Sequence, residues 1–458
     1  MCLCELFLWL NLRVILTLIL ACLIAVCFLC EKDPPHFPPG PPGLPFLGNI
    51  FSIESNQPHI YLTKLADIYG NVFCVRLGRH KTVFVSGWKM VKEAIVTQAE
   101  TFVDRPYSPM VTRIYSGNSA GLFFSNGKVW RRQRRFAMAT IRTFALANSS
   151  MEQNICSESL HLQEAMEKEE GQPFDPVPLL NNAVANIICM IVFRRRFDYN
   201  DQYFQNMLKK LTDVAYLEGS IWALLYDAFP ALMKHLPGPH NDIFTSSRSL
   251  EAFIRTEIER HNSLCKTWLC AVWIFSWLAV KPLLRLSQIF RKVQAEIDGV
   301  IGQVRQPTMV DKANLPYTDA VIHEIQRMGN IVPLNGLRMA AKDSKLGSYI
   351  IPKGTTVMPN LTSVLFDKNE WENPHTFYPE HFLDTEGKFV KREAFLPFSA
   401  GKRACLGEGL ARMELFLFFV SLLQKFHFST VEGVELSTEG ITGATRTPCP
   451  FKVFAKPR

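Results

Sequence analysis

The sequence predicts a mainly α-helical protein with a minor β-region and an N-terminal membrane anchor. Three observations predict this class. They are an uncharged apolar run near the N-terminus, apolar residues at helical spacing through most of the chain, and a few short alternating stretches. With 458 residues, 48% of them hydrophobic, the chain is long enough to bury a large core. No internal repeat or low-complexity linker follows residue 48, so residues 49–458 are predicted to form one domain.

Residues 1–30 are predicted to be a transmembrane signal anchor. Residues 14–30 are uncharged and mostly apolar, and the apolar stretch 6–12 precedes them, so the segment is long enough to span a bilayer. A cleaved signal peptide is the alternative. The sequence Cys-Glu-Lys-Asp at 30–33 lacks a small-x-small cleavage site, which favours retention of the anchor.

Residues 31–48 are predicted to form a stiff hinge. This stretch contains Pro-Pro-His-Phe-Pro-Pro-Gly-Pro-Pro-Gly-Leu-Pro, and proline fixes φ and removes a backbone donor. The segment therefore separates the anchor from the domain without forming a helix.

Periodicity predicts the elements of the domain. An alternating stretch at 72–85 predicts a β-hairpin that turns near Gly78, and further strand-like pieces lie at 346–351 and 355–358. Helical spacing predicts helices over 57–69, 88–96, 127–145, 180–192, 248–262, 292–302, 316–328 and 407–425.

Charge and cysteine usage exclude two classes of protein. The net charge of +8 suits an anionic membrane surface or an acidic partner, but no basic block with interleaved aromatic residues indicates nucleic-acid binding. Five of the twelve cysteines lie in the first thirty residues, and the others have no framework spacing. A disulfide-rich secreted scaffold is therefore excluded.

The most informative element is the stretch Phe398-Ser-Ala-Gly-Lys-Arg-Ala-Cys405-Leu-Gly407. Cys405 lies between two glycines and just before the apolar helical pattern of 407–425. Backbone N–H groups at a helix start favour a thiolate, which is a good ligand for haem iron. The alternative for a lone cysteine is a buried structural residue.

This stretch resembles the haem-thiolate loop of the cytochrome P-450 superfamily at Phe398, Gly401, Arg403, Cys405 and Gly407. The resemblance implies the cytochrome P-450 fold, with Cys405 as the axial ligand of the haem iron and the other four positions shaping the cofactor site. A proline-rich hinge after an anchor is typical of microsomal members. The resemblance therefore implies the endoplasmic reticulum membrane, with the catalytic domain in the cytosol.

Glu324 and Arg327 share one face of the predicted helix 316–328. A surface ion pair is the alternative for two such residues on their own. Their context resembles the family-2 microsomal form of the helix whose Glu/Arg pair supports the haem loop. The family's third partner is usually an arginine, and here His381 in Pro-Glu-His-Phe takes that place. Histidine still donates a hydrogen bond but lacks the arginine fork.

Trp130 and Arg134, four residues apart on the predicted helix 127–145, match the family's WxxxR element, which meets a haem propionate. Two further matches to propionate-binding positions are Arg105 and Arg338. The neighbouring arginines are predicted to fall on other faces of the helix, either as a solvated surface or as a docking patch for an acidic reductase (Arg131, Arg132 and Arg135).

The oxygen-activating helix of the superfamily, with its small-Gly-x-acid-Thr-Thr pattern, is not found in the sequence. It should follow residue 260, but residues 262–291 are atypical and shorter than the family's segment by several tens of residues. We therefore identify no catalytic acid–threonine pair. A skipped exon or translated non-coding sequence explains this better than a remodelled distal helix.

The resemblance implies a haem-thiolate monooxygenase that inserts one atom of O2 into a lipophilic substrate, such as a fatty acid, xenobiotic or steroid. Electrons come from NADPH through NADPH-cytochrome reductase, with cytochrome b5 as a second partner. The stretches around Pro379–Phe382 and Phe395–Arg412 look most like the branch that oxidises polyunsaturated fatty acids. Two alternatives stay open: an impaired or non-catalytic haem-binding isoform, and a related isomerase that needs no external electrons.

Overall fold

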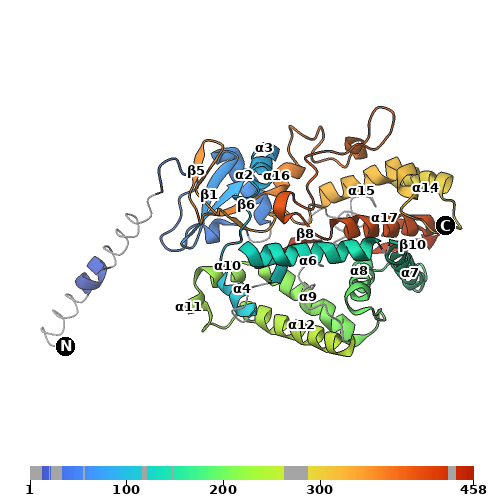
Figure 1. The fold of residues 1–458 in the computed structure, drawn as a ribbon, viewed down its shortest axis with the longest axis horizontal. Helices are drawn as coiled ribbons and strands as arrows, with labels where there is room; N and C mark the ends of the chain where they lie inside the picture. The colour runs from blue at the N-terminus through green and yellow to red at the C-terminus, as the bar shows by residue number, and fades with distance from the viewer. Residues whose placement is uncertain are drawn as a thin grey trace.

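The computed structural model describes residues 13–19, 21, 33–54, 57–115, 121–146, 148–261, 287–431 and 440–458. In these ranges a large helical body adjoins a small β-region (Figure 1), which confirms the mainly α-helical class with a minor β-region. Most of the predicted anchor (1–30) and of the atypical segment (262–291) lies outside the described residues. Residues 13–19 are helical and exposed. Among the described helices only Pro176–Phe193 is apolar and long enough to cross a membrane, and 56% of it is buried, as in a core helix.

The β-region is built around the predicted hairpin. Strands β1 (Val72–Leu77) and β2 (His80–Val85) pair antiparallel, β2 pairs parallel with β6 (Thr356–Pro359), and β6 pairs antiparallel with β3 (Arg338–Met339). Gly78 turns the hairpin with φ of +61°, a conformation that favours glycine. The sheet thus places β6 beside β2, more than 250 residues earlier in the chain, and β3 on the other side of β6.

The predicted hinge packs against this sheet. The backbone N–H of Cys74 in β1 donates to the carbonyl of Pro39 at 2.7 Å, and Asp33 forms ion pairs with Arg76 and Lys81. The described part of the hinge contains no helix, as its prolines predict.

Helix α17 (Glu408–Lys425) lies at the centre of the helical body. Its phenylalanines and leucines share one buried cluster with α7 (Asn148–Glu167), α8 (Pro176–Phe193), α14 (Ser287–Val300) and α15 (Pro316–Gly329). Helix α6 (Gly127–Leu146) crosses the middle of the view, and α9 (Gln202–Glu218) and α12 (His240–His261) pack on each other below it (Figure 1). This layering fixes the N-terminus of α17, where Cys405 lies.

The remaining elements are short. The helical ones are η1 (Ile50–Ser52), α2 (Pro58–Tyr69), α3 (Trp88–Lys92), η2 (Glu93–Thr97), α4 (Pro109–Ile114), α5 (Gly121–Phe124), α10 (Ile221–Ala228), α11 (Pro230–Met233), η4 (Asp311–Asn314), α16 (Leu361–Leu365), η5 (Pro379–Phe382) and η6 (Gly401–Arg403). The strands are β4 (Ser344–Leu346), β5 (Tyr349–Ile351), β7 (Phe426–Thr430), β8 (Gly440–Thr442), β9 (Arg446–Pro448) and β10 (Val453–Pro457).

Two predicted elements differ from the structure, and two long helices were not predicted. The helix predicted over 88–96 is α-helical only to Lys92 and continues as the π-helical turn η2. The strand predicted over 346–351 is a hairpin of β4 and β5, because Gly347 adopts φ of +59° and turns the chain. Helices α7 and α9 were not predicted, although Asp201 caps α9 and residues 204, 208 and 211 belong to its buried face.

Candidate functional site

The loop that carries Cys405 is closed by its own backbone. The N–H of Cys405 donates to the carbonyl of Phe398 at 3.0 Å. Gly401 adopts φ of +72°, and a Cβ there would lie 1.8 Å from the carbonyl oxygen of Ile95 in η2. Only glycine therefore lets the loop pack against η2.

The Cys405 sulfur is mostly buried, and burial raises the pKa of its thiol. Backbone N–H groups of Gly407 and Glu408 and the charge of Arg134 act in the opposite direction but do not outweigh burial. The N–H groups at the helix start therefore favour a thiolate, as expected, while burial favours the thiol. A bound metal ion would displace the proton.

Arg403 is buried and already has acceptors within the protein. Its guanidinium donates to the carbonyls of Val103 at 2.8 Å and Ser125 at 2.7 Å, and to Asn126 Oδ1 at 3.2 Å. It also lies 3.9 Å from the ring centroid of Trp130. Burial and the nearby Arg338 lower its pKa to about 9. The donors of Arg403 therefore serve mainly to hold the loop against residues 103–126, and few are left for a ligand.

Arg105 converges on the same place. Its Nε donates to the carbonyl of Phe123 at 3.1 Å, and its terminal nitrogen donates to the carbonyl of Leu337. Burial and the charges of Arg338 and Arg403 lower its pKa. Like Arg403, it is held by backbone carbonyls.

Arg338 is the exception in this cluster. Its side chain is fully buried, yet its Nε and one terminal nitrogen have no hydrogen-bond partner among the described residues. The other terminal nitrogen donates to Ser399 Oγ at 3.3 Å. Burial lowers the pKa of Arg338 to about 10, and the charge of Arg134 adds to this. Unpartnered buried donors are costly, so Arg338 is suited to bind an anionic ligand.

Trp130 and Arg134 share one face of α6, as their spacing predicts. Arg134 donates to the carbonyl of Ala404 at 2.8 Å, and its guanidinium lies 5.9 Å from the Trp130 ring centroid. Both residues line a surface hollow of about 410 Å³ with Arg131, Arg135, Lys402 and Glu100. Arg131, Arg132 and Arg135 are exposed whereas Trp130 is buried, as expected for other faces of the helix, and Arg131 and Arg135 border the hollow from the flank of α6.

Glu324 and Arg327 form a fully buried ion pair on α15, so the surface alternative is wrong. Arg327 donates to both carboxylate oxygens of Glu324, at 2.8 and 2.7 Å. His381 Nδ1 lies 3.3 Å from Glu324, and the N–H of Tyr378 donates to it at 2.9 Å. Arg327 also donates to three loop carbonyls (Leu365, Pro374 and Thr376). The pair thereby fixes the segment between α16 and η5.

Sequence reasoning missed three polar residues that organise the site. Asn126 accepts from the backbone of Arg105 and from Arg403. Ser399 accepts from Asn335 Nδ2 at 2.9 Å and from Arg338. Ser399 and Asn335 both adopt positive φ, of +62° and +52°. No motif marks them, because their roles depend on contacts between distant segments.

Comparison with known proteins identifies relatives over nearly the whole chain. The family model described as Cytochrome P450 matches residues 38–267 and 271–454, and its break lies inside the atypical segment. Cytochrome P450 2J1 of Oryctolagus cuniculus is 43% identical, covering 94% of this chain and 93% of that protein. Cytochrome P450 2J2 of Homo sapiens is 41% identical, covering 97% and 96%. Cytochrome P450 2D26 of Rattus norvegicus is 39% identical, covering 92% and 93%.

Proposed function

Since this chain belongs to the cytochrome P450 family, we propose that it is a microsomal monooxygenase in which Cys405 is the axial ligand of the haem iron. The family uses haem with a cysteine thiolate and receives electrons from NADPH through a reductase. The observation that supports the assignment most directly is Cys405 beside buried arginines that pair with no carboxylate among the described residues.

The residues present fit haem. Four cations surround the loop (Arg105, Arg134, Arg338 and Arg403), and Arg338 has unpartnered buried donors that two propionates would satisfy. A Cβ at Gly407 would lie 3.9 Å from the Cys405 sulfur, so glycine keeps that side of the sulfur open to a flat ligand.

Each residue then has a defined task. Cys405 would hold the iron as a thiolate, and the N–H groups of Gly407 and Glu408 face its sulfur. Arg338 and Arg134 hold carboxylates, while Arg403 fastens the loop to residues 103–126. Phe398 and Gly401 set the shape of the loop. When bound, haem supplies the iron at which O2 is activated, and the thiolate ligand favours O–O cleavage.

We propose a lipophilic substrate, such as a fatty acid, a xenobiotic or a steroid. Polyunsaturated fatty acids are favoured among these by the likeness of the Pro379–Phe382 and Phe395–Arg412 stretches to the branch that oxidises them. The two 2J relatives, at 43% and 41% identity, are compatible with this choice.

The hollow beside Cys405 is the proposed docking place for NADPH-cytochrome reductase. Four of the residues around it are basic (Arg131, Arg134, Arg135 and Lys402), and an acidic partner would complement them. Cytochrome b5 would compete for the same surface. The location that follows is the endoplasmic reticulum membrane, with the anchor at 1–30, the hinge at 31–48 and the haem domain at 49–458 facing the cytosol.

A non-catalytic haem-binding isoform is the second candidate. Residues 262–291 lack the acid–threonine pair that would deliver protons to O2. The alignment with the human relative spans 491 positions, 33 more than the 458 residues of this chain, so the relative has segments without a counterpart here. The proximal site would then bind haem without supporting turnover.

The reduced, CO-bound spectrum of the full-length protein tests the haem assignment. A thiolate-type Soret band is expected, and it should be lost in Cys405→Ala but kept in Cys156→Ala, since Cys156 is a free cysteine away from the site. A histidine-type band in the wild type, or a thiolate band in Cys405→Ala, would overturn the assignment. Product formation from arachidonate with NADPH and reductase then separates the monooxygenase from the non-catalytic isoform.

Charge reversal tests the docking surface. Arg131→Glu with Arg135→Glu should slow reductase-driven reduction about tenfold, because rim charges set association rates. Reduction by dithionite should be unchanged. Equal reductase-driven rates in the variant and the wild type would refute this docking surface.

A further inference from the structure

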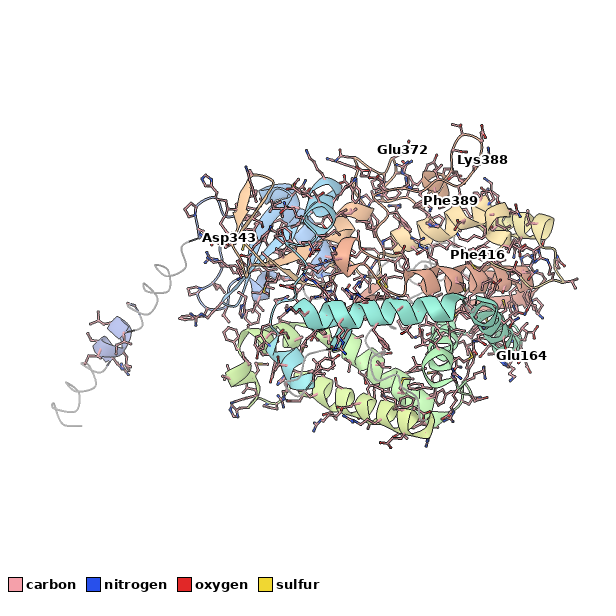
Figure 2. The ribbon with its side chains drawn as sticks, viewed as in Figure 1. Glu164, Asp343, Glu372, Lys388, Phe389 and Phe416 are labelled. Carbon is pink, nitrogen blue, oxygen red and sulfur yellow. The ribbon has the colours of Figure 1, made fainter. Side chains whose placement is uncertain are left out.

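His323 is a buried histidine next to Glu324 on α15, but it faces away from the Glu324–Arg327 pair. Its ring lies within 5.3 Å, centroid to centroid, of three phenylalanine rings (Phe382, Phe389 and Phe395). Phe389, labelled in Figure 2, comes from the long loop that follows η5. Because aromatic rings surround His323 on several sides, few polar groups lie close to its two ring nitrogens.

Both ring nitrogens nevertheless have partners. Nδ1 lies 2.8 Å from the carbonyl oxygen of Asp319, to which it donates. Nε2 lies 2.9 Å from a terminal nitrogen of Arg412 on α17. Arginine has only donors, so Nε2 is the acceptor in this contact and Nδ1 is the donor to Asp319.

Arg412 connects this histidine to the first turn of α17. Its Nε and its other terminal nitrogen bind Glu408 Oε1 at 3.0 and 2.9 Å. Its guanidinium lies 5.3 Å from the ring centroid of Phe398, the residue that closes the Cys405 loop. The backbone N–H of Glu408 faces the Cys405 sulfur.

We propose that His323 is a positioning residue for the Cys405 loop. It acts through Arg412, which it holds against Glu408 and Phe398, so that the first turn of α17 keeps its N–H groups directed at the sulfur. The proposal deepens the function assigned to this site and rests on it where the haem ligand is concerned.

The charges around His323 are consistent with this role. The carboxylate of Asp319 lies 3.1 Å from Nδ1 and also pairs with Lys312 of η4, so the Nδ1 side is anchored to α15 and η4. Arg412, with Glu408 behind it, is the charged group on the Nε2 side. Only the Nε2 contact reaches α17.

A double-mutant cycle tests the connection. His323→Leu removes the acceptor, His323→Gln keeps one at the same end of the side chain, and Arg412→Leu removes the donor. The matched control is His240→Leu. His240 is also buried and its Nε2 donates to the carbonyl of Met233 at 2.9 Å, but it packs against Tyr226 in another cluster.

The first readout is the rate at which the reduced, CO-bound haem protein loses its thiolate-type band. His323→Leu should raise this rate about tenfold, since a hydrogen bond to a charged group is lost. The double variant should be no faster than Arg412→Leu alone, because both changes break one connection. His323→Gln should stay close to the wild type, and His240→Leu should leave the rate unchanged.

The second readout needs no haem. The Cys405 thiol is only partly exposed, so a loosened loop should expose it further and speed its alkylation in the full-length protein, again about tenfold. Additive effects of the two leucine variants, or equal effects of His240→Leu and His323→Leu, would overturn the proposal. If the wild type lacks a thiolate-type band while the alkylation cycle behaves as expected, the haem assignment fails and the positioning role stands.

Discussion

Replacing Arg327 with methionine measures how much the buried ion pair of α15 contributes to stability. The change leaves the Glu324 carboxylate buried without its main partner and leaves three loop carbonyls without a donor. Breaking a buried pair in this way costs about 3–5 kcal/mol. Because native domains are stable by about 5–15 kcal/mol, the variant should fold poorly and retain little haem.

The assay is equilibrium unfolding in urea, followed by far-UV circular dichroism, together with the haem content of the purified protein. Arg255→Met is the matched control, because Arg255 also pairs with a glutamate on its own helix but is 71% exposed. That variant should lose no more than about 0.5 kcal/mol.

The loss of stability in Arg327→Met should depend on pH, in the direction set by the pKa of Glu324. Burial raises the pKa of Glu324, but the hydrogen bonds from Arg327 and His381 outweigh it and the net pKa is lowered. A carboxyl group with a lowered pKa stabilises the fold above its unfolded pKa of about 4.3 and loses this contribution as the pH falls. The difference between wild type and Arg327→Met should therefore shrink in acid. Equal losses in Arg327→Met and Arg255→Met at neutral pH would refute the reasoning.

Three further predictions follow from the same structure. Arg338→Met should weaken haem retention about tenfold, yet leave the haem-free protein at least as stable as the wild type, since it removes unpartnered buried donors. Arg403→Met should destabilise both the haem-bound and the haem-free protein, because it removes hydrogen bonds that hold the loop. Thermal melts of the two variants with and without haem compare these effects. Gly401→Ala should lower the free energy of unfolding by about 1–3 kcal/mol through backbone strain, and by more through the clash with Ile95. Purified Gly401→Ala protein with a full haem complement would contradict this prediction. Burial raises the pKa of Glu414 well above its usual value, so its contribution to stability falls as the pH rises above about 4.3, by about 1.4 kcal/mol per pH unit. Glu414→Gln should flatten that slope in urea unfolding as the pH rises above about 4.3, whereas parallel curves would contradict it.

Much of the site was predictable because its signals are local. The Cys405 loop and the spacing of Glu324 with Arg327 and of Trp130 with Arg134 each occupy a few consecutive turns of chain. The neighbours of these residues are set by helical periodicity, and the structure places the members of each pair in contact.

The sequence by itself determined the family, the mainly helical class and the cysteine on which the haem assignment depends. Only the tertiary structure decided which arginines bind backbone carbonyls and which one has donors left for a ligand. Arg403 and Arg105 look equivalent to Arg338 in the sequence, but backbone carbonyls from distant segments satisfy the first two and leave Arg338 with free donors. It also decided the protonation tendency of Cys405, because burial depends on everything packed around the sulfur. Local spacing fixes which side chains share a face, whereas desolvation and long-range hydrogen bonds arise only when segments hundreds of residues apart meet.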